Sequence, residues 1–210
     1  VTETEVARNP GLAVVGAIYS EGDFTGNGNS ATISGVDSCG SAADVPAIYN
    51  LDPATTSISG GTVAGAIENG VDDLDLGNYI DILKESSSSI TTLTADVNGA
   101  TYGSAADFVT VYSETSGNAG GLRMSNINGY GNLIVEGDLI LAGGFTWTGL
   151  VVVTGTLTFN GGGTGVNISG AVMSEDVVDL NGGLEIYYDS CAVGEALNSL
   201  GYKVLNWRQL

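Results

Sequence analysis

Short apolar runs recur through the C-terminal half of the chain, separated by glycine clusters and repeating about every 20 residues. Each repeat has an apolar strand, a turn at a small or charged residue, a second strand, a glycine cluster and a third apolar alternation. Stacked repeats of this kind bury a continuous interior that no single repeat can bury alone. The pattern therefore predicts three turns of a parallel β-solenoid over residues 131–190. The copies are LIVEGDLILAGGFTWTG from Leu133, LVVVTGTLTFNGGGTGVNISG from Leu150 and AVMSEDVVDLNGGLEIYYDS from Ala171.

A fourth copy, AIYSEGDFTGNGNSATISG from Ala17, predicts a first turn over residues 17–37. Residues 38–130 do not show the repeat, so we expect them to form an insertion that makes the solenoid discontinuous. The fold class predicted is mainly β, a short discontinuous parallel β-solenoid, or β-helix, with one packed α-helix and an inserted lobe. All of it fits a single domain over residues 1–210.

The packed helix is predicted near residues 75–87, within the insertion. Asp75 is the expected N-cap and Lys84 falls in the last turn. Apolar residues at helical spacing predict the face that packs along the solenoid, and they are Leu76, Tyr79, Ile80 and Leu83.

The final segment, residues 191–210, is predicted to cap the solenoid. Residues 192–200 suit a short helix and residues 202–207 a closing strand, which would cover the unpaired strand edges of an open end. The residues expected to include many of the stacked core positions are Leu139, Leu141, Val151, Val153, Val172 and Ile186.

The charge of the chain limits the kinds of partner that it is expected to bind. Acidic residues outnumber basic ones by 24 to 5, for a net charge of −19, so nucleic acid and anionic membrane surfaces are excluded as expected partners. The same surface suits high salt, divalent cations or a cationic partner, or serves solubility alone.

Two cysteines, Cys39 and Cys191, stand far apart in a chain rich in glycine, serine, threonine and asparagine. That composition is common in exported β-proteins, so one disulfide is expected, and with it an extracellular or cell-surface location. The alternative is a pair of buried free thiols in a cytosolic protein.

Catalysis is constrained because the chain contains no histidine, which removes every histidine base and nucleophile system. A carboxylate pair, as in solenoid polysaccharide hydrolases, is the remaining route. We expect no enzyme activity, because the candidate acids stand where a turn or helix start explains them. These acids are Asp72, Asp73 and Asp75 before the helix, and Glu175, Asp176 and Asp179 in the third C-terminal repeat.

Calcium is a second use for acids, since it takes six to eight oxygen ligands. The candidate ligands are Asp72, Asp73 and Asp75, and separately Asp23 with Asn27 and Asn29. Neither set follows an EF-hand pattern. Helix capping and turn formation are the alternative explanation for both sets. No other cofactor is expected.

A threonine array indicates a flat face for ice or carbohydrate, or else only ordinary outward β-propensity. Its members are Trp147 with Thr146, Thr148, Thr154, Thr156 and Thr158.

The stretches GNLIVEGDLILAGGFTWTGLVVVTGTLTF, IYYDSCAV and VLNWRQL resemble the C-terminal region of PilX-like type IV pilus assembly proteins. The resemblance covers residues 129–210 and extends to ISGVDSCG around Cys39. It implies a glycine-rich β-solenoid behind an N-terminal hydrophobic helix in an exported bacterial minor-pilin-like protein, with other pilins or pilus assembly proteins as partners. The 210 residues do not include that helix or a prepilin cleavage site, and we expect membrane contact only through such a helix.

The resemblance predicts a non-catalytic extracellular domain that acts in pilus assembly, tip display or surface adhesion, including contact with a surface or glycan ligand. Two alternatives stay open. One is a free secreted binder of ice or polysaccharide, because a discontinuous solenoid with a side helix is also the layout expected of bacterial ice-binding domains. The other is a carboxylate-pair polysaccharide hydrolase.

Overall fold

The computed structural model describes residues 2–7, 12–26, 30–52, 56–70, 73–115, 120–200 and 203–209. In the first half of the chain the strands are β1 (Thr2–Ala7), β2 (Ile18–Ser20), β3 (Phe24–Gly26), β4 (Thr32–Ser34), β5 (Ile48–Asn50), β6 (Thr56–Ile58), β7 (Thr62–Ala64), β8 (Ile67–Asn69), β9 (Ile90–Leu93) and β10 (Val97–Tyr102). In the second half they are β11 (Val109–Glu114), β12 (Leu122–Glu136), β13 (Leu139–Ala142), β14 (Phe145–Tyr188) and β15 (Lys203–Gln209). The helices are α1 (Leu76–Ser86) and α2 (Ser190–Asn198).

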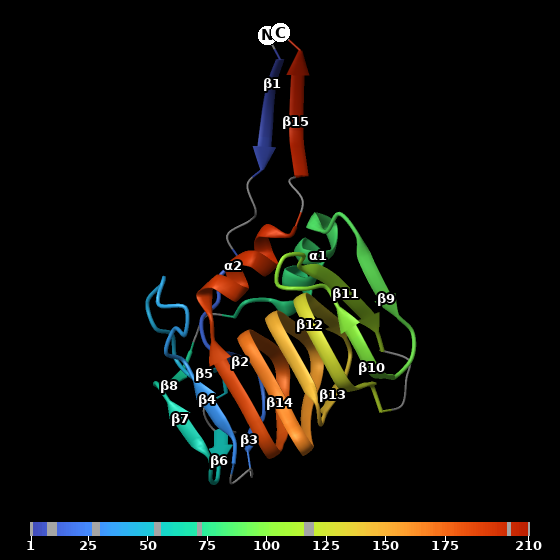
Figure 1. Ribbon diagram of the computed structural model, residues 1–210. Coiled ribbons are helices and arrows are strands. Elements are labelled where there is room, and N and C mark those ends of the chain that lie inside the picture. Colours follow the sequence, from blue (N-terminus) through green and yellow to red (C-terminus); the bar gives the residue numbers. More distant parts are fainter. Residues whose placement is uncertain are drawn as a thin grey trace.

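Thirteen strands form one sheet with parallel pairing, and their main path runs β8-β5-β2-β14-β13-β12-β11-β9. Asn128 pairs with Thr146 and Leu139 pairs with Leu157, so one turn of the coil takes 18 residues at both places. Figure 1 shows these strands stacked side by side in a coil. The predicted mainly β fold with a parallel solenoid is therefore confirmed.

The chain enters this coil in its middle. Val172 of β14 pairs with Ile18 of β2, Ile18 pairs with Ile48 of β5, and Ile48 pairs with Ile67 of β8, which is one end of the path. The chain then passes through α1 to β9 at the other end, and β11 to β14 return it to the middle (Figure 1). The solenoid is thus discontinuous in sequence and continuous in space.

The predicted insertion over residues 38–130 is wrong in extent, because most of its strands belong to the coil. Residues 48–69 add turns beyond β2, and residues 90–130 add turns at the opposite end. The repeat is lost toward the two ends of the stack, where the strands are short and exposed: β8 and most of β9 lie exposed there. An end turn has one neighbour, so it needs fewer apolar residues than an inner turn.

The predicted helix is confirmed as α1, which lies along the coil. The side chain of Asp75 caps it by accepting from the Asn78 amide at 3.2 Å. Lys84, in its last turn, donates to Glu136 Oε1 at 2.6 Å and lies 4.4 Å from the ring centre of Tyr112. Both partners belong to the coil, so this end of the helix is held by β11 and β12. All four residues of the predicted packing face are buried, and they are Leu76, Tyr79, Ile80 and Leu83.

The predicted terminal cap is corrected in two respects. α2 forms, but it packs against β14 and β12 on the flank of the coil, where Asn132 Nδ2 donates to the Ala196 carbonyl at 2.8 Å. The closing strand forms as β15, but it pairs antiparallel with β1 in a separate two-stranded sheet, with both chain ends at its tip (Figure 1). The sequence does not reveal this pairing, because neither segment carries the repeat.

The interior of the coil includes every core position that the repeat predicts. The six core residues predicted from the repeat are all fully buried: Leu139, Leu141, Val151, Val153, Val172 and Ile186. Gly131, Gly149 and Gly170 form a column at one corner, each with φ between 129° and 144°. A Cβ at Gly149 would collide with the Gly131 carbonyl oxygen, so both the backbone conformation and the close approach require glycine there.

Candidate functional site

The cysteine junction joins two segments that are 152 residues apart in sequence. Cys39, just after β4, and Cys191, in the first turn of α2, form a disulfide with their Cα atoms 5.8 Å apart. This is the predicted pairing. A disulfide indicates an oxidising environment, which is typical of the cell exterior.

Asp37, which no motif in the sequence marks, organises this junction. Its buried carboxylate accepts from the backbone amides of Ser190 at 2.9 Å, Ala42 at 2.9 Å and Cys39 at 3.3 Å, and from the Ser190 hydroxyl at 2.8 Å. These hydrogen bonds, the Ser190 amide first, hold the pKa of Asp37 far below its ordinary value. The only sequence signal was its position two residues before Cys39.

Acid is expected to weaken this junction. The depressed pKa means that Asp37 stabilises the fold above the ordinary aspartate pKa of about 4, and that this contribution is lost as pH falls toward the folded-state pKa. We predict that the melting temperature of Asp37→Asn is already lower at neutral pH and falls less steeply between about pH 5 and pH 2 than that of the wild type. Asp81→Asn, an exposed change of equal charge, is the control and should retain the wild-type slope. Parallel acid slopes for wild type and Asp37→Asn would contradict this role.

The acids before α1 are occupied by backbone amides. Asp73 Oδ1 accepts from the Asp75 amide at 2.8 Å, and Asp75 Oδ1 caps the helix. Asp72 lies outside the described residues. Glu21 is half-buried nearby, and its pKa is raised, first by burial and then by the charge of Asp73. The structure therefore gives Asp73 and Asp75 the roles of turn and cap.

The acids of the third C-terminal repeat meet the first turn. Asp176 Oδ1 accepts from the Asp23 amide at 2.7 Å, and the Glu175 carbonyl accepts from the Gly22 amide at 2.7 Å. Glu175 is exposed. The side chain of Asp179, together with Asn27 and Asn29, lies outside the described residues. Asp176 thus fastens the N-terminal turn of the coil to the C-terminal one.

Metal ligation finds little support among these acids. Within the described part of the chain, the one group of three ligand-type side chains close enough to share an ion is Cys39, Asp189 and Cys191. Its two sulfur atoms are bonded to each other, so they are not free thiolates. Asp73 and Asp75 therefore do not form part of a three-acid cage with other described residues.

The predicted threonine array does not share one face. Trp147 is wholly buried, stacks on Phe145 with ring centres 6.0 Å apart, and donates from Nε1 to the Gly131 carbonyl at 3.0 Å. The Thr154 hydroxyl accepts from the Gly137 amide at 3.0 Å. Alternation along the strand places Trp147 inside and its threonine neighbours toward the surface.

A smaller polar row does face outward. Thr101 pairs with Asn128, which pairs with Thr146, and all three side chains are exposed on adjacent parallel strands. Strand spacing in a sheet puts them about 4.8 Å apart. The row belongs to three different turns, so the repeat alone could not reveal it.

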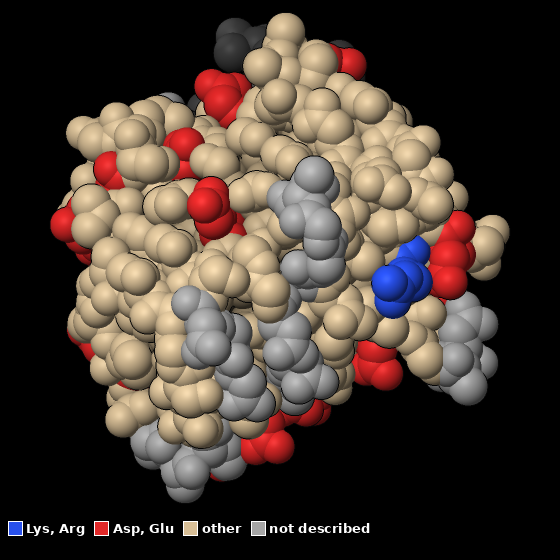
Figure 2. Space-filling view, turned by 60° about the horizontal axis from the view of Figure 1, so that its bottom comes forward, with Lys and Arg blue, Asp and Glu red and all other residues tan. Residues whose placement is uncertain are grey.

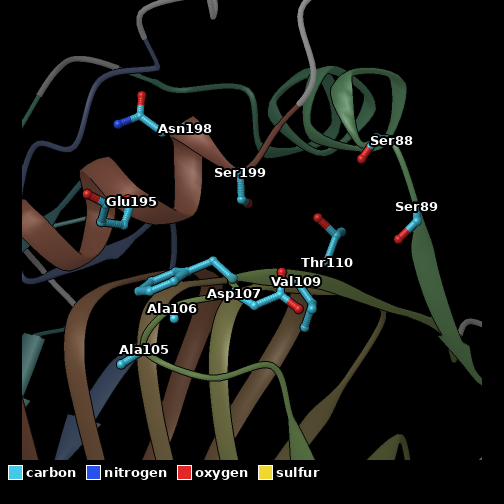
Figure 3. Close-up of a pocket in the computed structure, with 11 residues that line it drawn as sticks. Ser88, Ser89, Ala105, Ala106, Asp107, Val109, Thr110, Glu195, Asn198 and Ser199 are labelled. Carbon is cyan, nitrogen blue, oxygen red and sulfur yellow. The ribbon is translucent and has the colours of Figure 1, made fainter.

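A polar cavity of about 410 Å³ lies between α2, the segment before β11 and the residues after α1. In Figure 3, Ser199 extends from the end of α2 above Thr110 and Asp107, and Ser88 and Ser89 form the opposite wall. Its lining residues are Ser88, Ser89, Ala105, Ala106, Asp107, Phe108, Val109, Thr110, Glu195, Asn198 and Ser199. The sequence does not reveal this cavity, because its three walls are about 20 to 110 residues apart and carry no shared motif.

Acidic side chains are spread over the face shown in Figure 2, where basic side chains occupy a single spot. Among the described residues, neither helix is long and apolar enough to cross a membrane. No protein-family model, curated protein or solved structure matches the chain. Fold and junction together define a disulfide-linked parallel β-solenoid with a helix packed along it.

Proposed function

We propose that this chain is a non-catalytic, exported bacterial domain of a type IV pilus-associated minor pilin, acting in pilus assembly, tip display or surface adhesion. The observation that carries the proposal is the Cys39–Cys191 disulfide. Cys191 lies in the YYDSCAV segment, one of the stretches that resemble PilX-like proteins, and Cys39 lies in ISGVDSCG, the other end of the resemblance. A disulfide that joins the two resembling segments supports an exported, rigid recognition module.

The coil suits such a role mechanically. Its turns are held together by parallel strand pairing and by the hydrogen bond from the Asp23 amide to Asp176. The salt bridge between Lys84 and Glu136 fixes α1 to the coil. Loops carried on a rigid scaffold commonly hold recognition sites. Of the acids that the sequence singled out for catalysis, three have carboxylates that accept hydrogen bonds from backbone amides, which favours a structural role for them over hydrolysis: Asp73, Asp75 and Asp176.

Deleting the gene in a bacterium that carries it is expected to reduce the number of surface pili or to abolish their adhesion, as counted by electron microscopy and surface-binding assays. Complementation with the wild-type gene or with Asp81→Asn should restore the phenotype. Complementation with a variant that cannot fold, such as Val151→Asp, should not. Normal pili and normal adhesion in the deletion strain would contradict the proposal.

A free secreted binder of ice or polysaccharide is the second candidate, and the exposed row of Thr101, Asn128 and Thr146 favours it. Thermal hysteresis by the purified domain, lost in Thr146→Lys, would support ice binding. Absence of thermal hysteresis would exclude ice binding.

A further inference from the structure

The polar cavity beside α2 has the dimensions of a ligand site. Its volume of about 410 Å³ lies within the range of small-molecule pockets, roughly 300–1,000 Å³. Its walls come from three segments whose positions are fixed. The disulfide and the hydrogen bond from Asn132 hold α2 in place. The segment before β11 forms a turn with two backbone hydrogen bonds, of 2.9 and 3.0 Å, between Ser104 and Asp107. The hydroxyl groups of Thr110 and Ser87 form a hydrogen bond of 2.9 Å, which fixes the residues after α1.

The charge around the cavity is negative. Asp107 and Glu195 line it, and no lysine or arginine is among its described lining residues. α2 ends at its rim, at Asn198, with no basic residue in the last turn. The last carbonyl groups of a helix carry a partial negative charge, so this end favours a cation or a hydrogen-bond donor. An anionic ligand would meet repulsion from Asp107, Glu195 and the C-terminal end of α2.

Hydroxyl groups supply the second recognition element. Ser88, Ser89, Thr110 and Ser199 all line the cavity, and each hydroxyl both donates and accepts. Ser199 donates to the Ala196 carbonyl at 2.7 Å, which leaves its oxygen lone pairs for a donor in the cavity. In Figure 3, Asp107, Thr110 and Ser199 border the same space. A ligand that matches this wall carries several hydroxyl groups.

We infer that the cavity binds an amino sugar, a hexosamine residue whose free ammonium group pairs with Asp107 and whose hydroxyl groups bond to Ser88, Thr110 and Ser199. Phe108 adds an apolar surface to the lining for the sugar ring. Two features, a positive charge and several hydroxyl groups, distinguish this ligand from related compounds. N-acetylation removes the positive charge, a plain hexose lacks it, and a lysine side chain lacks the hydroxyl groups. This inference rests on the recognition role proposed above, but it does not require attachment to a pilus.

Titration calorimetry with the purified domain tests it at mildly acidic pH, where the amine of glucosamine carries its proton. The probes are a glucosamine trisaccharide, its fully N-acetylated form, the corresponding glucose trisaccharide and lysine amide. The glucosamine trisaccharide is expected to bind about tenfold to a hundredfold more tightly than the other three, because each of them loses a charge-assisted bond or several hydroxyl bonds. Equal binding of lysine amide, or of the N-acetylated form, would overturn the assignment.

Variants distinguish binding in the cavity from non-specific electrostatic attraction to a chain with a net charge of −19. Asp107→Asn is expected to weaken the glucosamine trisaccharide about tenfold or more, and Ser199→Ala to weaken it by a smaller factor. Glu185→Gln removes the same charge from an exposed position on β14, away from the cavity, and should bind like the wild type. If Asp107→Asn and Glu185→Gln weaken binding equally, the attraction is diffuse and the site is wrong.

The outcome is independent of the pilus experiment. A domain that binds no amino sugar can still be required for pili, and the deletion strain reports that directly. Incubation of the trisaccharide with the domain, followed by mass spectrometry, should show no cleavage. Cleavage would overturn the proposal that the domain is non-catalytic.

Discussion

Replacing Val151 by Asp is expected to abolish folding of the domain. Val151 is fully buried, lies in β14 and pairs with Leu133 on the neighbouring turn. A carboxylate there would lose its hydration without gaining a partner, at a cost of several kcal/mol, against a total stability of about 5–15 kcal/mol for a typical domain. Circular dichroism should show loss of the β-sheet signal and of a cooperative thermal transition.

Thr146→Asp is the matched control for this experiment. It places the same carboxylate on the same strand five residues earlier, where the side chain is exposed. Its melting curve should stay close to that of the wild type, since surface changes alter stability by about 0.5 kcal/mol or less. A cooperative Val151→Asp protein with near-normal stability would contradict the inward position of this strand face.

Removing the disulfide has the second large expected effect. The bond closes a loop across a separation of 152 residues, for which the chain-entropy argument gives an upper value of about 5 kcal/mol, and typical disulfides contribute about 2–4 kcal/mol. Urea unfolding of the double variant Cys39→Ser, Cys191→Ser should show a midpoint shifted down by a corresponding amount. Reduction of the wild type should produce the same shift, and it should leave the double variant unchanged.

Intact-mass measurement after alkylation gives the complementary check on the pairing. The unreduced wild type should take up no alkylating label, and the reduced protein should take up label at Cys39 and Cys191. Two labelled thiols without reduction would contradict the disulfide, and with it the inference of an oxidising environment.

The repeat made the inner turns predictable. Residues such as Leu139 and Val172 lie in short apolar runs on strands that have a turn on each side, so their burial leaves a clear signature in the sequence. α1 was predictable for a related reason, because Asp75 and the spacing of Leu76, Tyr79 and Leu83 record both its start and its packed face.

The outer turns were not predictable, because end strands such as β8 and β9 are short and mostly exposed. Trp147 was assigned to a surface array from the threonines beside it, although period-2 alternation equally allows it to face inward. The cavity was out of reach for another reason. Ser88, Asp107 and Ser199 converge only because α1 passes along the coil and α2 folds back onto its flank.

The direct test of the whole arrangement is the contact between β2 and β14. These strands belong to the turns that come first and last in the sequence and are neighbours in the coil. Through-space NMR contacts in the isotope-labelled domain should link the backbone of Tyr19 to Met173 on one side and to Tyr49 on the other, as the parallel register requires. Contacts from Tyr19 to Tyr49 without any to Met173 would contradict the account, because the N-terminal turns would then form a unit separate from the C-terminal coil.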